Sequence, residues 1–452
     1  MNSRVEPEPV PLAARPTVGA GATLASASQF VAAGASWLTG VVVARLLGAS
    51  GAGDFGVVMT LFLTLSAFSN LGLQIGATYE VSHGRWQAGE ALRQSQLAAL
   101  VLGAASVLVG AAAVAAGGSS VFRGIGFSAF ILALSGMPFA LSWSFASNVL
   151  LAADRFLLYA LGPALQGVAG VVLAAVFGSL FGLEGAVAGM TGSNLLAAAF
   201  VLALGGRSLP RPSPGWLRRS LEPLRRAVRF GIKSYFSNAV FFLNLRADLF
   251  ILNAVAASAA VGRYAVAISI TNLAGLAPRA LSSVVLPRVA SLDRGTSDVE
   301  RDMVTTKSVR HGVIIVGVTA VVLVVVLLAV PLIYGSEFGG TVGLGMILIP
   351  GTCALGVAGI LAATIVGRGH PEYSIYSALI VTPPAVVAYL LLVPPLEGLG
   401  AALASTISYL FTLAVSAHYF RKASGLRGTA LFLPRRAELD DYVLLARRAR
   451  RR

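Results

Sequence analysis

Two charged residues, Arg246 and Asp248, stand within the otherwise apolar run LNLRADLFIL at 243–252. If this run lies in a bilayer, each charge costs at least about 2.5–3.5 kcal/mol on insertion scales, so its presence indicates a function or a buried partner. A guanidinium group binds phosphate or an acidic sugar. A buried carboxylate can respond to a proton or a sodium ion.

Helical geometry separates the two charges. On a continuous helix Ser237, Asn244 and Asp248 share one face, and Arg246 falls on the opposite face. Residues two apart do not face each other, so Arg246 and Asp248 do not form an ion pair within the helix. We therefore expect one of them to face a cavity and the other to pair with a neighbouring helix, and Asn244 is a further cavity candidate on the face of Asp248.

The composition places the whole chain in a membrane. Hydrophobic residues make up 56% of the 452 residues and charged residues only 12%, whereas a soluble domain has roughly 25% charged residues. Windows of about 19 residues predict an all-α polytopic membrane protein with about twelve transmembrane helices. The predicted spans are 22–47, 55–80, 95–117, 126–151, 157–180, 184–205, 231–254, 264–287, 311–334, 341–366, 374–393 and 398–420.

The distribution of basic residues supports this count. If both termini are cytoplasmic, 29 of the 34 Lys and Arg residues fall on the cytoplasmic side, and only Arg45, Arg123 and Arg263 fall on the other side. This asymmetry is what the positive-inside rule predicts for a multi-pass protein of the cell membrane. We therefore attribute the net charge of +15 to the basic cytoplasmic loops and tails, and we expect no nucleic-acid binding. The basic tail is expected to contact anionic lipids.

The chain divides into two halves of six spans. We expect a cytoplasmic tail, a first six-helix bundle, a basic cytoplasmic linker, a second six-helix bundle and a basic cytoplasmic tail, at 1–19, 20–206, 207–230, 231–421 and 422–452. GDFGVVMTL at 53–61 resembles GRYAVAISI at 262–270, and GAVAGMTGSNL at 185–195 resembles GAALASTISYL at 400–410. The nearly constant offset indicates two pseudo-symmetric bundles, an arrangement common in transporters that bind their substrate between the halves.

This symmetry adds candidates to the cavity. Arg279 lies beside Pro278 inside the eighth span, and the repeat offset pairs it with Asn70 of the first half. Arg279 either faces the cavity or extends its guanidinium to the inner interface. Glu80, near the inner end of the second span, is a cavity acid or, in the favoured interpretation, an interfacial charge.

Arg45 and Asp54 flank the turn between the first two spans. An interfacial clamp between these two side chains is favoured over contact with a substrate.

Other site chemistries find little support. The single cysteine, Cys353, excludes an internal disulfide, and four scattered histidines predict neither a metal site nor a catalytic cluster. No cofactor is expected. A polymerase or ligase would need a sizeable outer loop with catalytic groups, and every outer connection here is about a dozen residues or shorter, so we expect no enzyme.

Three segments resemble a known family. They are ARLLGASGAGDFGVVMTLFLTLSAFSNLGLQIGA at 44–77, LRADLFILNAVAASAAVGRYAVAISITNLAGLAPRALSSVVLPRVASL at 245–292, and VPLIYGSEFGG with ILIPGTCALG at 330–356. They are similar to signatures of the polysaccharide and O-antigen (Wzx-type) flippases of the multidrug, oligosaccharidyl-lipid and polysaccharide exporter superfamily. The resemblance covers most of 20–420. Many relatives have an aspartate where this chain has Asn70, so the role of that acid does not transfer.

The resemblance implies a flippase that moves a polyisoprenoid-(di)phosphate-linked oligosaccharide across the cytoplasmic membrane by alternating access. Because such a cargo is anionic, Arg246 is favoured for the cavity together with Arg279, and Asp248 is left for proton or sodium coupling or for a structural role. Glycosyltransferases and a glycan polymerase are the expected partners. Two alternatives remain open: a cation-coupled multidrug exporter of the same superfamily, whose cavity would favour acids and aromatic rings, and a non-transporting scaffold of a glycan assembly complex.

Overall fold

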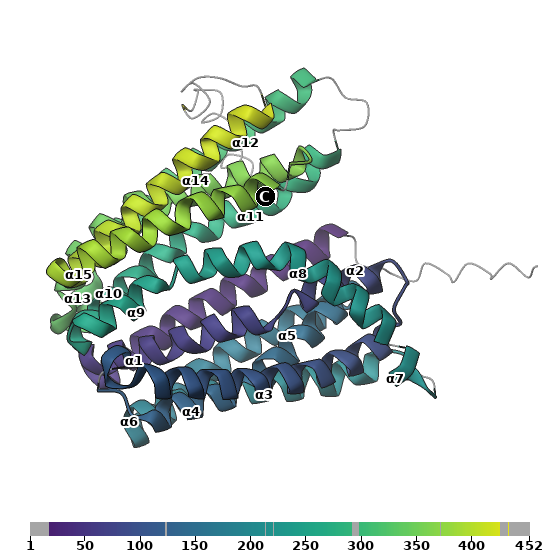
Figure 1. The fold of residues 1–452 in the computed structure, drawn as a ribbon, viewed down its shortest axis with the longest axis horizontal. Coiled ribbons are helices and arrows are strands. Elements are labelled where there is room, and N and C mark those ends of the chain that lie inside the picture. Colours follow the sequence, from purple (N-terminus) through teal and green to yellow (C-terminus); the bar gives the residue numbers. More distant parts are fainter. Residues whose placement is uncertain are drawn as a thin grey trace, which may run out of the picture.

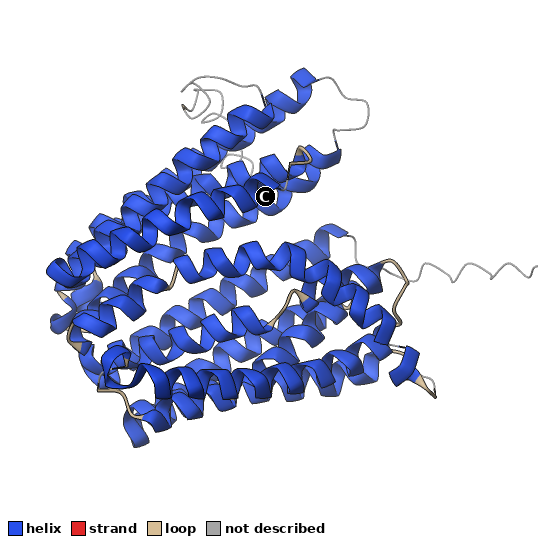
Figure 2. Ribbon diagram, viewed as in Figure 1, coloured by secondary structure: helices blue, strands red, loops and turns tan. Residues whose placement is uncertain are grey.

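The fold is known from a computed structural model, which describes residues 18–122, 124–212, 214–219, 221–291, 298–370, 372–424 and 433. Throughout this part of the chain the regular structure is helical and contains no strand (Figure 2). The all-α prediction is therefore confirmed. Nearly all of the predicted terminal tails lies outside the described residues.

The first bundle contains the first six passes. Its helices are α1 (Val18–Ser69), α2 (Leu73–Ser82), α3 (Ala88–Val121), α4 (Phe127–Ser135), α5 (Met137–Ala152) and α6 (Phe156–Ser208). The long helices α1 and α6 each contain two passes, because the chain leaves helical geometry at Gly48 (φ 69°) and Gly182 (φ 62°). Glycine is suited to these turns because it has no Cβ to clash at positive φ.

The second bundle follows a short connecting helix, α7 (Trp216–Arg219). Its elements are α8 (Leu221–Asn244), α9 (Ala247–Val255), α10 (Ser258–Thr271), the 3₁₀ turn η1 (Asn272–Gly275), α11 (Leu276–Ser291), α12 (Asp298–Leu328), α13 (Val330–Tyr334), the 3₁₀ turn η2 (Ser336–Phe338), α14 (Gly340–Gly367) and α15 (Glu372–Ser424). Helix α15 turns back at Glu397 (φ 47°), and Gly400 then lies against the Leu392 carbonyl.

The number of passes agrees with the hydropathy pattern. Eight helical stretches are long and apolar enough to cross a membrane. Three of them, α1, α6 and α15, turn back on themselves, and α8 with α9 adds one more crossing. Each of the twelve predicted spans therefore has a helical counterpart.

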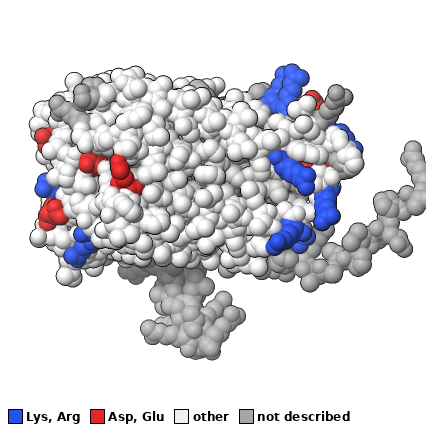
Figure 3. Space-filling view, turned by 90° about the horizontal axis from the view of Figure 1, so that it is seen from below, with Lys and Arg blue, Asp and Glu red and all other residues white. Residues whose placement is uncertain are grey.

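The two bundles form a V (Figure 1). They meet near α13 and the α9–α10 junction, and they diverge toward α7. Lys and Arg side chains gather at the diverging end, which we call the basic end, and Asp and Glu are prominent at the other, which we call the acidic end (Figure 3). On the face shown in Figure 3, the surface between the two ends is almost free of charge, as a bilayer-spanning band requires.

Helix α8 crosses from one bundle to the other. Near the basic end its backbone packs directly on α2, where Gly231 meets Gly72 and Ala227 meets Gly76. A side chain on either Gly72 or Gly76 would overlap the backbone of α8. Beyond residue 246 the chain continues as α9, which packs on α10 and α15 of the second bundle. The seventh span therefore contacts both bundles: α8 packs on α2 near the basic end, and α9 packs mainly on α15 and also touches α1 and α3 of the first bundle.

Candidate functional site

A cavity of about 550 Å³ lies between the bundles, and we call it the central cavity. The first bundle lines it with both passes of α1 and with parts of α4, α5 and α6, and the second bundle with α9, α10, η1 and α11. Its charged lining residues are Arg246 and Arg279, and none of the described lining residues is Asp or Glu. The cavity wall is therefore electropositive on the side of the second bundle.

Arg246 lies at a break in the seventh span. Helix α8 ends at Asn244 and α9 begins at Ala247, so the expected continuous helix was wrong. Arg246 adopts non-helical geometry there (φ −127°, ψ −10°). The prediction that placed Arg246 and Asp248 on opposite faces of one ideal helix therefore does not apply across this break. The guanidinium of Arg246 lies 5.5 Å from the centre of the Phe242 ring, and its Nε is buried without a hydrogen-bond partner in the described structure.

Arg279 lies one turn after a second break. The 3₁₀ turn η1 separates α10 from α11, and the Arg279 side chain folds back against Gly275. The guanidinium is accessible from the cavity. It forms neither an ion pair nor a hydrogen bond with any residue that the structure describes. Arg246 and Arg279 thus both offer unpaired positive charge to the same cavity.

Asp248 is fully buried inside the second bundle and does not line the central cavity. The Tyr264 hydroxyl donates to its Oδ2 at 2.6 Å, and the backbone N–H of Leu249 donates to its Oδ1 at 2.7 Å. Ser405 lies 2.9 Å from the Tyr264 hydroxyl and 3.1 Å from the Tyr389 hydroxyl. If Tyr264 donates to the carboxylate, Ser405 donates to Tyr264 and Tyr389 to Ser405, so the whole chain of hydroxyls is polarised toward Asp248.

Of the two asparagine candidates, Asn70 lies outside the lining of the central cavity. Asn70 is buried in the break between α1 and α2, where Leu71 and Gly72 have positive φ angles of 48° and 71°. Its side-chain oxygen has no partner within the described chain, and it does not contact the central cavity. Asn244 ends α8, and its side chain is outside the part that the structure describes.

The predicted clamp between Arg45 and Asp54 was wrong. Arg45 Nε donates to the Ile333 carbonyl at 2.7 Å, and its guanidinium also donates to the Leu332 carbonyl. Asp54 accepts a hydrogen bond from the Ser258 side chain. Each of these two side chains of the first bundle therefore reaches across to the second bundle: Arg45 to α13 and Asp54 to the start of α10.

Further contacts hold the bundles together at the acidic end. Asn253 Nδ2 donates to the Val121 carbonyl at 2.6 Å, and the rings of Phe122 and Phe250 meet edge to face at 6.4 Å. Gly53 lies so close to the Ser258 carbonyl that a Cβ would overlap it. The central cavity is consequently sealed at this end by direct backbone contact.

Glu80 lies at the basic end and pairs with Arg226 of α8, with Arg226 Nε 3.0 Å from Glu80 Oε2. Only 3% of the Glu80 side chain is exposed, and it is not part of the cavity wall. The pair fastens α8 to α2 beside the Gly72–Gly231 approach.

Several cavity residues were missed by the sequence reasoning. The first bundle contributes Trp143, whose indole N–H donates to Asn194 Oδ1 at 3.0 Å, and Gln166. In the second bundle Asn272 lies within η1 and lines the cavity. Polar or aromatic residues isolated in apolar spans were the available signal, but only packing shows which of them face inward.

Comparison with known proteins supports the family resemblance. The sequence model of the family described as polysaccharide biosynthesis protein matches residues 18–293. The capsular polysaccharide biosynthesis protein CapF of Staphylococcus aureus is 28% identical over 189 residues, which is 41% of this chain and 47% of CapF. The match thus spans about half the length of that relative.

Solved structures share the architecture. The lipid II flippase MurJ in an inward closed conformation superposes with a TM-score of 0.68 at 14% identity, covering 89% of this chain and 90% of MurJ. A multidrug resistance MATE family transporter of the MOP superfamily, in an inward-facing conformation, gives a TM-score of 0.64 at 16% identity, covering 86% of this chain and 94% of that one. At these identities the likeness establishes the fold. With a family match over more than half its length, this chain belongs to the polysaccharide biosynthesis protein family and has the two-bundle fold of MOP superfamily transporters.

Proposed function

We propose that this protein is a flippase that moves a polyisoprenoid-diphosphate-linked oligosaccharide, or a related polysaccharide precursor, across the cytoplasmic membrane. The observation that carries the proposal is the charge of the central cavity: among the described residues its lining contains two arginines, neither of which forms an ion pair there, and no acid. A diphosphate is a doubly charged anion, and the planar guanidinium group of arginine can donate two parallel hydrogen bonds to a phosphate.

The remaining wall suits a glycan. Trp143, Asn194 and Gln166 offer an aromatic face and amide groups opposite the arginines. Amides can both donate to and accept from sugar hydroxyls, and an indole presents flat apolar area. We therefore assign the phosphates to the second bundle and the sugars to the first.

The open form fits loading from the cytoplasm. By the positive-inside rule the basic end faces the cytoplasm, which places both termini on that side. The V opens toward the same end (Figure 1). In alternating access the bundles would rock so that the sealed acidic end opens and the basic end closes.

Asp248 is proposed to couple transport to a proton or to sodium. A change in its charge would alter the hydroxyl chain that joins α9, α10 and α15, immediately beside the break that carries Arg246. Flipping measured with an imposed pH gradient and, separately, with an imposed sodium gradient distinguishes the two ions.

The test is flipping of a fluorescent lipid-linked oligosaccharide in proteoliposomes. Arg246→Ala and Arg279→Ala each remove charge-assisted hydrogen bonds worth about 1.5–3 kcal/mol, so each should slow flipping about tenfold or more. Arg279→Lys keeps the positive charge but loses the planar guanidinium that can form two parallel hydrogen bonds. Its flipping rate should therefore lie between those of Arg279→Ala and the wild type. Arg225→Ala is the matched control, because Arg225 is exposed on α8 outside the cavity.

Wild-type rates in both Arg246→Ala and Arg279→Ala would contradict the assigned roles. The flippase proposal itself would be contradicted by two results together. The wild-type protein would flip no lipid-linked oligosaccharide in proteoliposomes, and cells that lack the protein would still export the glycan. A drug exporter for cationic compounds is disfavoured because none of the described lining residues of the central cavity is Asp or Glu. A glycan assembly scaffold would support export without flipping in the purified system, so the proteoliposome assay separates it from a transporter. Glycosyltransferases and a glycan polymerase are the proposed partners.

A further inference from the structure

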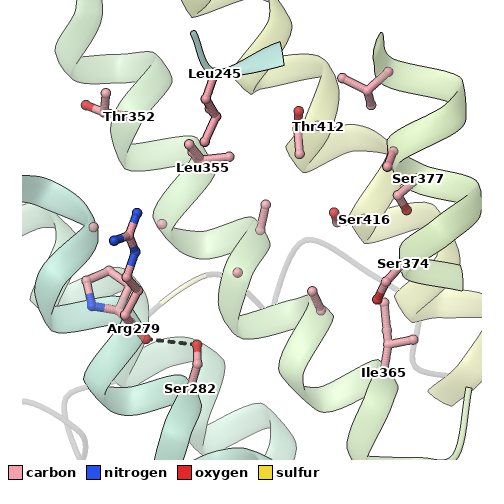
Figure 4. Close-up of a pocket in the computed structure, with 18 of the residues that line it drawn as sticks. Leu245, Arg279, Ser282, Thr352, Leu355, Ile365, Ser374, Ser377, Thr412 and Ser416 are labelled. Atoms are coloured by element: carbon pink, nitrogen blue, oxygen red, sulfur yellow. Dashed lines mark hydrogen bonds between the residues drawn. The ribbon is translucent and has the colours of Figure 1, made fainter. Parts of the chain in front are cut away.

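A second cavity of about 310 Å³ lies inside the second bundle, and we call it the side slot (Figure 4). It runs between α11, α14 and the two passes of α15, with Leu245 near one end and Ile365 near the other. Along α14 the lining extends from Thr352 to Ile365. Thirteen residues of α-helix correspond to ~20 Å, so the slot is long and narrow.

The wall of the side slot is mostly apolar, although it carries several hydroxyl groups. Ser282 donates to the Pro278 carbonyl at 2.8 Å, Thr352 to the Leu348 carbonyl at 3.1 Å, and Thr412 to the Ser408 carbonyl at 2.8 Å. These three hydroxyl hydrogens are used within their own helices, whereas Ser374, Ser377 and Ser416 donate to no residue that the structure describes. Because the wall is mostly apolar, the slot matches a hydrocarbon chain better than a sugar, whose many hydroxyls would need more partners than this wall offers.

The side slot and the central cavity share two lining residues, Asn272 and Arg279. Among the described residues that line the slot, Arg279 is the one that carries a charge. Its guanidinium thus marks the boundary between a roomy polar cavity and a narrow apolar one. A ligand that uses both spaces would have an anionic group at this junction and a thin hydrocarbon chain beyond it.

We propose that the side slot binds the isoprenoid units nearest to the phosphate of the lipid-linked substrate. This inference rests on the proposed flippase function and extends it from the headgroup to the lipid. The glycan occupies the central cavity, a phosphate contacts Arg279, and the first part of the polyprenyl chain lies along α14. A volume near 300 Å³ is at the small end of ligand sites, which suits a short segment of chain rather than the whole lipid.

A single substitution can fill the slot without disturbing the backbone. Gly359 of α14 lines the slot, and a Cβ added there meets no atom within 4 Å. Gly343 of the same helix is equally open but lines neither cavity. Gly359→Leu and Gly343→Leu are therefore matched in helix, residue type and local space, and they differ in which space the new side chain enters.

The experiment measures binding of two ligands to the full-length protein in nanodiscs. One is a polyprenyl-diphosphate disaccharide, and the other is the same disaccharide diphosphate without the lipid. Gly359→Leu should weaken binding of the lipid-linked ligand at least tenfold and leave the lipid-free ligand unchanged, while Gly343→Leu should change neither. Equal binding of the lipid-linked ligand to both variants would overturn the slot assignment while leaving the flippase proposal intact.

A second measurement uses the wild-type protein, so its result does not depend on whether a variant folds. A polyprenyl diphosphate with a diazirine in its first isoprenoid units should label wild-type peptides from 352–365 of α14 or 373–381 of α15, and excess phosphatidylglycerol should not prevent the labelling. Labelling elsewhere, or displacement by an equal amount of phosphatidylglycerol, would overturn the assignment. If wild-type protein binds neither disaccharide ligand, the proposed function itself fails.

Discussion

Arg246 and Asp248 are two residues apart, yet one lines the central cavity and the other lies inside the second bundle. The helix break between α8 and α9 separates their surroundings. Arg246 lines the cavity and has a buried Nε with no hydrogen-bond partner among the described residues, whereas Asp248 accepts hydrogen bonds from Tyr264 and Leu249. A charge retained in the membrane thus has a different physical reason at each position.

At the residue scale, the hydrogen bonds of the hydroxyl chain should contribute unequally to the free energy of unfolding. Tyr264→Phe removes a hydrogen bond to a carboxylate, worth about 1.5–3 kcal/mol, whereas Tyr389→Phe removes a bond between neutral hydroxyls, worth about 0.5–1.5 kcal/mol. Each substitution removes one phenolic hydroxyl group from a buried tyrosine of the same network. Unfolding in detergent should show Tyr264→Phe to be the more destabilising by about 1 kcal/mol. Equal destabilisation would argue against a charged Asp248 at the end of the chain.

At the element scale, helix breaks and glycine contacts determine how the spans meet. The second span breaks at Asn70–Gly72 and the eighth at η1, so both pseudo-symmetric halves interrupt the same helix. Between the bundles, Gly53 of α1 touches the α10 backbone, and Gly262 of α10 touches the Ala49 carbonyl. Such approaches need residues without a Cβ, and they make the acidic end a tight seal.

The seal predicts a difference between two glycines one turn apart. Gly53→Ala would drive a Cβ into the Ser258 carbonyl, whereas Gly56→Ala meets only the Ala265 methyl at 3.3 Å. Gly53→Ala should therefore separate the bundles at the acidic end, and Gly56→Ala should not. Spin labels at positions 180 and 332, in a Cys353→Ala background, report the distance between the bundles. An unchanged distance distribution in Gly53→Ala would show that the seal does not depend on this contact.

At the scale of the whole molecule, the two bundles meet at the acidic end and diverge at the basic end (Figure 1). The contacts of Arg45, Asp54 and Asn253 all cross between the bundles at the meeting end. Near the basic end, the first bundle contacts α8 through Gly72, Gly76 and Glu80. Rocking of the bundles would thus require the acidic-end contacts to break while α8 stays on α2 or bends at the 245–246 break.

A disulfide across the meeting end should arrest the cycle. In a Cys353→Ala background, Phe122→Cys with Phe250→Cys joins residues of different bundles whose rings are 6.4 Å apart. Phe122→Cys with Phe130→Cys joins residues of the first bundle whose rings are 4.9 Å apart. Oxidation should stop flipping in the first pair and spare it in the second, and a reductant should restore it. Continued flipping with the first crosslink in place would contradict rocking at this end.

The sequence by itself determined the class, the spans and the family. Apolar stretches of about 20 residues must be helical in a bilayer because their backbone groups have no water to bind, so hydropathy suffices to locate them. Lys and Arg asymmetry predicted which turns share an end, and Figure 3 shows the basic side chains gathered there. The similarity of 44–77 and 245–292 to flippases is confirmed by the family match over 18–293.

Only the tertiary structure decided what each polar side chain touches. The partners of Arg45 and Asp54 lie across the bundle interface, and the Asp248 network joins residues as distant in sequence as Ser405. The breaks at 245–246 and η1 redirect the chain in ways that an ideal helical wheel cannot express. Periodicity reports the direction of a side chain within one helix, whereas a site between bundles depends on how helices far apart in sequence pack.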